Sequence, residues 1–352
     1  MLQVISNDDP LKWNKTVKSF KDHDVYYLAE YSKAFQIHGD GDPILFYFDN
    51  GKIRAINVVM KRDIALDSRF NNLIPENTYY DISTPYGYGG WLFDNVHYEQ
   101  LFLNELDLRY RELCLDNNII CEFVRFHPIL RNKGKLNTIY DITELGKTIT
   151  INLNSKDEIW NGLSGKNRNV IRKAQKNDVK VYSGRSKNLF SNFKDIYNKT
   201  MDKDQANDYY YFNDDFYSSI LNDLNSNSQI FYAQFDEKII SAAIILYANN
   251  QIHYHLSGSL KEFQHLAPTN LLLYEVACWG VDNGYKTLHL GGGLGSSEDS
   301  LFKFKQAFNK NSDTVFSIGK KIFNHEKYNQ LIELRKQSKE IKNMGFFPLY
   351  RG

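Results

Sequence analysis

The chain has 352 residues, which suggests two domains by the loose rule of about 100–200 residues per domain. Its 43 Lys and Arg residues nearly balance its 42 Asp and Glu residues, so no global field favours nucleic acid or a membrane surface, and any anion binding must be local. The three cysteines fit no zinc or redox spacing and are typical of buried thiols in a reducing compartment. The start of the chain shows no leader pattern, and no apolar run approaches the roughly 20 residues of a membrane span. We therefore expect a cytoplasmic protein with no transmembrane segment.

In the first half of the chain, residues 44–62 predict a β-hairpin that turns at residues 49–51. Residues 101–128 then predict a helix that stops at an Asp-Asn pair and continues into a strand. Between them, the prolines and glycines of "STPYGYGGW" exclude a regular helix or a central strand, so the sequence predicts a loop that displays Tyr86 and Tyr88 beside Gly89. Displayed tyrosines suit stacking on a sugar or peptide, and a purely structural turn is the alternative.

The second half repeats this order. Residues 229–248 predict a hairpin that turns near residues 236–237, and residues 269–293 predict a helix, an Asp-Asn stop and a strand. A repeat at this long period indicates a duplicated α/β domain. We place the boundary near Lys147, giving domains 1–147 and 148–352, and expect the second domain to end in an amphipathic helix over residues 324–342.

The segment "LHLGGGLGSSEDSLFKFKQAF" begins with a strand that runs into Gly291, Gly292 and Gly293. Backbone N–H groups at such a strand exit can bind an anion or an oxyanion. The spacing matches neither a Walker loop nor GxGxxG, so nucleotide binding is disfavoured. The alternative is a glycine-rich exit that lets another backbone segment pass closely.

The helix after the glycines places a lysine on its apolar face. Lys305 shares that face with Leu301, Phe304 and Phe308 at helical spacing. Its stem either extends along the apolar surface to reach water, or its ammonium is held in a cleft to meet a carboxylate, a phosphate or a developing negative charge.

A short basic helix is predicted within residues 165–180. Arg168 and Arg172 share a face by the i, i+4 rule, and Lys173 lies beside them. Arginine pairs suit bidentate binding of phosphate, although most charge runs are solvated surfaces.

Histidines alternate with apolar residues on two predicted strands. Arg125 and His127 lie on the first, which occupies the place of the glycine strand in the other copy, and His253 and His255 lie on the second. Such histidines are either general bases or buried side chains satisfied by hydrogen bonds. No metal-binding motif and no serine-nucleophile motif is present in the sequence.

Together, the duplicated α/β unit, the "TPYGYGG" loop, the "RNVIRKAQKN" helix and "LHLGGG…SLFKFKQAF" resemble the FemABX-like branch of the GNAT (acyl-CoA N-acyltransferase) superfamily, including proteins with a BioF2-like acetyltransferase domain. The resemblance implies two tandem GNAT-like domains, each a mixed twisted sheet flanked by helices. It also implies a transferase that moves an acyl or aminoacyl group onto an amine or hydroxyl. Fem-type relatives take amino acids from charged tRNA to build peptidoglycan cross-bridges, and others belong to surface-polysaccharide pathways.

The expected site follows from these features. We expect Lys305 and His255 to be catalytic, and the substrate-binding candidates are Tyr86, Tyr88, Gly89, Arg125, His127, Arg168, Arg172, Lys173, Asn270, Gly291, Gly292 and Gly293. The family binds the coenzyme A pyrophosphate at a glycine-containing turn, but here no glycine lies between Leu260 and Asn270. Backbone amides at the start of this helix remain available to an anion.

Two questions stay open at the level of sequence. The donor is either acyl-CoA or aminoacyl-tRNA, and we expect no tightly bound cofactor. The acceptor is a small or lipid-linked envelope precursor. Peripheral contact with a membrane is compatible with this expectation, and DNA is not expected as a partner. The alternative function is a non-catalytic glycopeptide or sugar-nucleotide binding protein. Loss of turnover rather than of affinity in a Lys305→Ala variant separates the two.

Overall fold

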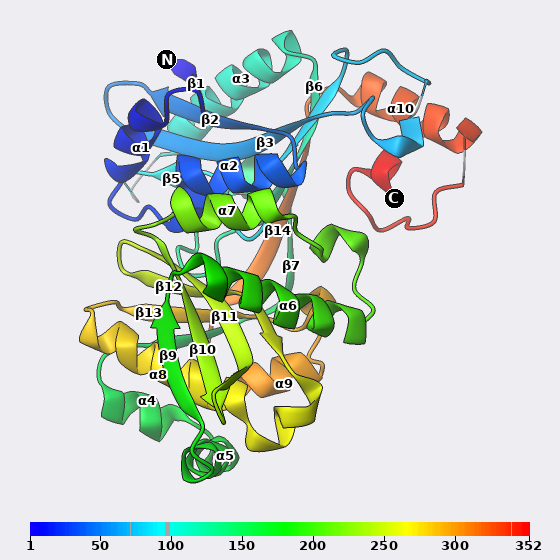
Figure 1. Cartoon of the computed structure of the whole chain (residues 1–352). Helices are drawn as coiled ribbons and strands as arrows, with labels where there is room; N and C mark the ends of the chain where they lie inside the picture. The colour runs from blue at the N-terminus through cyan, green and yellow to red at the C-terminus, as the bar shows by residue number, and fades with distance from the viewer. Residues whose placement is uncertain (71, 96–98, 339) are drawn as a thin grey trace. The chain divides into compact units, whose positions relative to one another are not determined.

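The computed structural model describes residues 1–70, 72–95, 99–338 and 340–352 (Figure 1). The chain forms two compact units, one made of Met1–Leu145 with Phe316–Gly352 and the other of Gly146–Val315. The expected second domain, 148–352, was wrong at its C-terminal end, because residues 316–352 return to the first unit. The physical reason is strand pairing, since the strand that begins at Val315 bonds to a strand of the first sheet.

The first unit is built on an eight-stranded sheet. Seven strands follow the order β1-β2-β3-β4-β6-β14-β7, and β5 pairs with β3. Their bounds are β1 (Leu2–Ser6), β2 (Asp42–Asp49), β3 (Arg54–Asp63), β4 (Tyr80–Ser83), β5 (Leu92–Phe93), β6 (Ile119–Phe126), β7 (Asp141–Lys147) and β14 (Val315–Ile322). Within this sheet β4 and β6 are parallel, whereas β14 runs antiparallel to β6.

The described residues of this unit form four α-helices: α1 (Pro10–Lys18), α2 (Ala29–His38), α3 (Gln100–Asp116) and α10 (His325–Ser338). The apolar side of α3, with Leu103, Leu106 and Tyr110, packs into the core over the sheet. Helix α10 packs into a second cluster that also buries Tyr350 near the C-terminus. The helix expected over 324–342 is therefore present as α10, and its expected course at residue 339 lies outside the described residues.

The second unit is built on a six-stranded sheet of order β8-β13-β12-β11-β10-β9. The bounds are β8 (Ile149–Asn152), β9 (Lys180–Gly184), β10 (Ser228–Phe235), β11 (Lys238–Ala248), β12 (Gln251–Ser259) and β13 (Thr287–Gly291). Strands β12 and β13 are parallel, and β8 runs antiparallel to β13.

The helices of the second unit are α4 (Lys156–Gly162), α5 (Gly165–Lys176), α6 (Lys187–Lys203), α7 (Asp214–Asn222), α8 (Pro268–Asp282) and α9 (Ser300–Gln306). Helix α8 contributes Leu272 and Val276 to the core, where they meet Ile252 and Leu288 of the sheet. Helix α6 lies against β11 and β12.

The expected duplication is present in the strand order. Each unit has a hairpin, β2–β3 or β10–β11, followed by two parallel strands with a helix between them. The predicted second hairpin turns at Asp236 and Glu237, both in the left-handed region with φ of 46° and 60°. The last parallel strand is followed in the sheet order by β14 in one unit and by β8 in the other. The shared order confirms the expected fold class, α/β with two tandem sheet-and-helix domains.

Candidate functional site

Two parallel strands of the second unit separate at their C-terminal ends. Strand β12 pairs with β13 only over Gln251–His253, and the last pair joins His253 to His289. Beyond it, β12 continues to Ser259 bonded to β11, while β13 ends at Gly291 (Figure 1). In the first unit the equivalent position is bridged, because Gly89 pairs with Phe126 of β6. In the second unit the ladder between the parallel strands is therefore open beyond His253 and His289.

The three glycines leave β13 beside this opening. Gly291 has a φ of 77°, in the left-handed region that favours glycine, and the register of β13 with β8 shifts just before it. A Cβ on Gly292 would lie 3.0 Å from the Lys147 carbonyl oxygen, and one on Gly293 would lie 2.1 Å from the Ser297 carbonyl oxygen. These glycines let backbone segments pass closely, and they also turn a carbonyl toward α9.

That carbonyl binds Lys305. The Lys305 Nζ donates a hydrogen bond of 2.7 Å to the Gly292 carbonyl oxygen, and the side chain is 8% exposed. Burial lowers the pKa of Lys305 to about 8, with the carboxylate of Asp299 acting in the opposite direction. The ammonium is thus mostly protonated at neutral pH and does not extend along the surface to water.

The apolar face predicted for α9 was partly wrong. Leu301 is 42% exposed, while Phe302 and Phe308 are buried in the core of the second unit. The buried side chains of α9 are Phe302 and Lys305, three residues apart, so the inward face of the helix includes Phe302 in place of the predicted Leu301.

A buried asparagine connects three helices near Lys305. Asn167, 2% exposed in α5, donates to the carbonyl of Ala307 at the end of α9 and accepts a 2.8 Å hydrogen bond from Asn270 of α8. The sequence reasoning selected Asn270 but missed Asn167. A polar side chain in the first turn of a helix, next to the N-cap Ser164, was the available signal.

Helix α8 begins without a side-chain cap. It starts with Pro268 after Ala267, which adopts a left-handed conformation with φ of 54°. The Thr269 hydroxyl lies 3.1 Å from the hydroxyl of Ser241 on β11. The chain therefore forms a left-handed entry to this helix although it has no glycine there.

His255 lies at an irregularity of β12. The register against β11 passes from Ile244–Leu256 to Ile245–Tyr254, so His255 is the extra residue of a bulge. Burial, and then the neighbouring His253, lower the pKa of His255 to about 3. A histidine of such low basicity is a poor general base at neutral pH. Of the two expected catalytic residues, Lys305 is therefore the stronger candidate.

The basic helix α5 uses its two arginines differently. Arg168 Nη1 donates to the carbonyls of Leu163, Trp160 and Asn161, the last at 3.4 Å, and so binds the C-terminal end of α4. Arg172 is exposed and lies over the Trp160 ring, 5.0 Å from its centroid, and Lys173 is exposed. Arg168 Nη1 is thus taken by the carbonyls left at the end of α4, and the phosphate-binding role expected of Arg168 and Arg172 stays a prediction that Arg172 is better placed to meet.

We expect Arg168→Ala to lower the stability of the protein by about 1–3 kcal/mol, because carbonyls at the α4 end lose their donor. Arg172→Ala should cost about 1 kcal/mol at most, the value of an exposed contact with an aromatic ring, and our prediction that Arg172 binds phosphate further expects weaker donor binding with a flatter salt dependence. Thermal unfolding and donor titration at several salt concentrations measure both, with exposed Lys176→Ala as the control. Equal stability losses at the two arginines would contradict this division of roles.

Two predicted substrate-binding tyrosines of the first unit pack into aromatic clusters. Tyr86 stacks on Phe35 with ring centroids 5.5 Å apart, and Tyr88 meets the Tyr26 ring edge-on at 5.6 Å. Burial raises the pKa of the Tyr88 hydroxyl. The segment is a loop as expected, but both tyrosines are only partly exposed and their rings are held by neighbours.

The remaining candidates of the first unit support the same loop. Gly89 donates its N–H to the Arg125 carbonyl at 2.8 Å, and a Cβ on it would lie 2.8 Å from the Thr84 methyl. His127 is fully buried, with Nε2 2.7 Å from Asp24 Oδ2 and Nδ1 accepting from a backbone N–H. Because both ring nitrogens are occupied, the geometry favours the structural alternative for His127, and its expected substrate-binding role stays a prediction.

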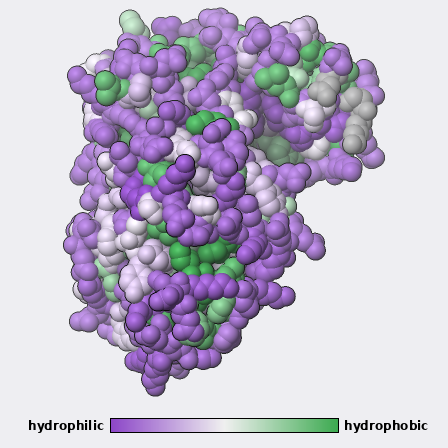
Figure 2. Space-filling model, viewed as in Figure 1, coloured by the Kyte–Doolittle hydropathy of each residue, from purple (hydrophilic) through white to green (hydrophobic). Residues whose placement is uncertain are grey.

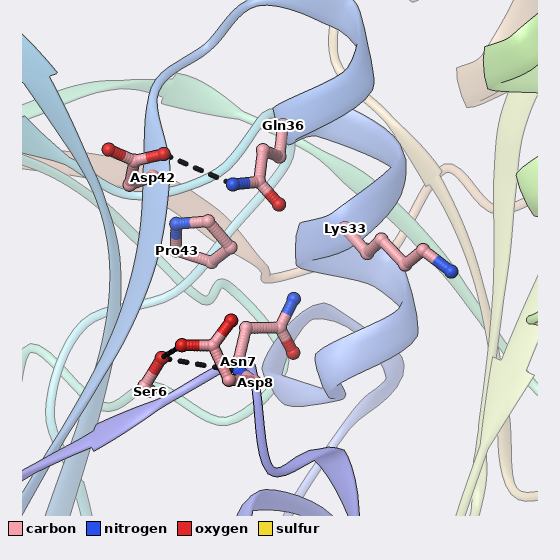
Figure 3. Close-up of a pocket in the computed structure, with 7 residues that line it drawn as sticks. All are labelled: Ser6, Asn7, Asp8, Lys33, Gln36, Asp42 and Pro43. Carbon is pink, nitrogen blue, oxygen red and sulfur yellow. Dashed lines mark hydrogen bonds between the residues drawn. The ribbon is translucent and has the colours of Figure 1, made fainter.

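A surface pocket of about 340 Å³ lies elsewhere in the first unit (Figure 3). It is lined by Ser6, Asn7, Asp8, Lys33, Gln36, Asp42 and Pro43. The Ser6 hydroxyl donates to Asp8 and the Gln36 amide donates to Asp42, so these polar groups bond to one another (Figure 3). None of the predicted site residues lines this pocket, and we assign it no role.

Hydrophilic residues cover most of the face shown in Figure 2. Within the described part of the chain, no helix combines the length and apolar character needed to cross a membrane.

Residues 165–305, which run from α5 to Lys305, match the family model of the acetyltransferase (GNAT) domain. This stretch of the second unit is therefore similar to a GNAT domain, and the expected class of enzyme, an acyltransferase, is confirmed. No curated protein sequence matches the chain.

Solved structures share the fold over nearly the whole chain. FemX is 14% identical, with 94% of this chain and 99% of that chain covered and a TM-score of 0.68. The C-terminal domain of a putative lysylphosphatidylglycerol synthetase from Agrobacterium fabrum is 11% identical, with coverage of 92% and 94% and a TM-score of 0.56. A conserved protein of unknown function from Bacteroides thetaiotaomicron is 12% identical, with coverage of 91% and 98% and a TM-score of 0.58. The predicted resemblance to the FemABX-like branch is thus confirmed in fold.

Proposed function

We propose that the protein transfers an acyl or aminoacyl group onto an amine or hydroxyl of a cell-envelope precursor, a peptidoglycan peptide or a surface-polysaccharide sugar. The observation that carries this proposal is the opening between β12 and β13, bordered by the glycine exit and by the buried ammonium of Lys305 on Gly292. The fold shared with FemX and with a lysylphosphatidylglycerol synthetase domain supports an acceptor of the envelope.

In the proposed reaction the acceptor nitrogen or oxygen attacks the donor carbonyl carbon. Negative charge develops on the carbonyl oxygen, and the Lys305 ammonium stabilises it. The acyl bond to the donor breaks as the new bond forms, and the acceptor proton leaves with the departing group, a thiol from acyl-CoA or a ribose hydroxyl from aminoacyl-tRNA. His255 is the less favoured catalytic candidate in this scheme, because a pKa of about 3 makes it a weak base.

The donor would bind along the start of α8 and the exposed part of α5. Helix α8 has no side-chain cap, so the N–H groups of its first turn suit a phosphate. Arg172 and Lys173 are exposed cations that suit a phosphodiester chain. The proposal keeps both acyl-CoA and aminoacyl-tRNA as donors. Ala267 forms the left-handed entry to α8, but it lacks the glycine that lets a coenzyme A pyrophosphate approach the backbone most closely.

A matrix of donors and acceptors tests the proposal. Acetyl-CoA, longer acyl-CoAs and a mixture of aminoacyl-tRNAs are each incubated with UDP-linked peptidoglycan precursors and with UDP-sugars, and the acceptor mass is measured. A mass increase equal to one acyl or aminoacyl group supports transfer and identifies the donor. Saturable precursor binding with no mass change under any donor would favour the alternative, a non-catalytic glycopeptide or sugar-nucleotide binding protein.

The cytoplasmic location remains a prediction.

A further inference from the structure

Asp299 is attached to both segments that build the Lys305 site. Its Oδ1 accepts a 2.8 Å hydrogen bond from the N–H of Phe302, which makes Asp299 the N-cap of α9. Its Oδ2 accepts from the N–H of Leu294 at 3.1 Å, in the turn that follows the glycines. One carboxylate therefore joins the helix that carries Lys305 to the loop that carries Gly292.

The glycine loop is closed tightly around this carboxylate. A Cβ on Gly293 would lie 2.5 Å from Asp299 Oδ1, so only glycine fits there without a shift. The Ser297 hydroxyl donates to the Leu294 carbonyl at 2.8 Å and completes the turn. Movement of Asp299 would thus move the loop, and with it the carbonyl that holds the Lys305 ammonium.

Asp299 also acts on Lys305 through its charge. Hydrogen bonds from the Phe302 and Leu294 N–H groups lower the pKa of Asp299, so the carboxylate is ionised at neutral pH. Its negative charge opposes the effect of burial on Lys305. The other charged side chains of this loop and helix, Glu298 and Lys303, are exposed.

We propose that Asp299 is a positioning residue of the transfer site, which joins the loop that carries the Gly292 carbonyl to the helix that carries Lys305 and so fixes that carbonyl against the ammonium. This inference rests on the proposed function only for the role of Lys305 in turnover. The positioning role itself follows from the two hydrogen bonds that Asp299 accepts and from the contact of the Lys305 ammonium with the Gly292 carbonyl, and it needs no substrate.

The test is a titration of Lys305 that needs no substrate. Lysines are reductively methylated with ¹³C-formaldehyde, and the Lys305 resonance is assigned by its absence in Lys305→Ala. Asp299→Asn keeps an oxygen that can cap α9 but removes the charge and the second acceptor, so the Lys305 titration should move to lower pH by about half a unit or more. Glu298→Gln removes the neighbouring exposed carboxylate and should leave the titration in place.

With an established substrate, the alkaline limb of turnover in Asp299→Asn should move by the same amount, whereas KM should change less. A merely structural cap would lower the melting temperature without moving the titration, and that result in folded Asp299→Asn would overturn the inference. The two proposals fail separately. If the titration moves but Lys305→Ala keeps full turnover, the proposed role of Lys305 is wrong and the positioning by Asp299 stands.

Discussion

Lys305→Ala should lower turnover by roughly a hundredfold or more on an established acceptor, with a much smaller change in KM. The reason is that a preorganised donor at a developing oxyanion is typically worth about 2.7–4 kcal/mol of the barrier. The ammonium is buried and held at 2.7 Å by Gly292, so its removal leaves no other cation in that place on α9. Steady-state kinetics with the donor identified by the mass assay measures this effect.

The matched control is Lys303→Ala, which removes an exposed lysine from the same helix and should leave turnover unchanged. The pH profile adds a second readout. Because the pKa of Lys305 is about 8, wild-type turnover should fall as the pH rises through that value and the ammonium loses its proton. The control should keep this limb, and near-normal turnover of Lys305→Ala would mean that the reacting atoms lie elsewhere in the fold.

Asp81→Ala should destabilise the first unit by about 3 kcal/mol, because it removes a fully buried carboxylate from two partly buried arginines, of which Arg351 keeps Asp67 as a second partner. Asp81 is fully buried on β4, where its Oδ1 accepts from Arg62 Nε at 2.6 Å and its Oδ2 accepts from Arg351 Nε at 2.6 Å. Tyr350 also donates to Asp81, so this carboxylate, together with Asp67, holds the C-terminal residues on the first unit. Thermal unfolding should show a fall in melting temperature of about 10 °C.

The control for Asp81 is Glu112→Ala, which breaks an exposed ion pair with Arg109 on α3 and should cost less than about 1 kcal/mol. Acid adds a second test. Burial raises the pKa of Asp81, but Arg351 and Arg62 outweigh it, so its pKa lies below the usual range. The stabilisation is therefore present above the unfolded-state pKa of about 4 and is lost as the pH falls through the folded value. An Asp81→Ala variant as stable as wild type at pH 7 would contradict this account.

Much of the candidate site could be predicted because its signals are local. The glycine strand, the lysine on the helix after it and the parallel strand before α8 all lie within residues 251–308, and the GNAT match covers most of that span. Asp299 could have been found from its position as an N-cap before an apolar run. For Asn167 the sequence shows only a polar side chain in the first turn of α5, and its role could not be predicted, because that role depends on Asn270 and Ala307, which lie more than a hundred residues away.

The sequence by itself determined the class of fold and the duplicated order of hairpin, helix and strand. It also determined that a strand, β13, precedes the glycines and that a helix, α9, follows them. These depend on periodicity, turn residues and caps, which act over a few residues. Only the tertiary structure decided that β14 joins the first sheet, that Arg168 binds the end of α4, and that both ring nitrogens of His127 are occupied. The physical reason is that strand pairing and buried hydrogen bonds join groups far apart in the chain, where composition and spacing carry no information about the partner.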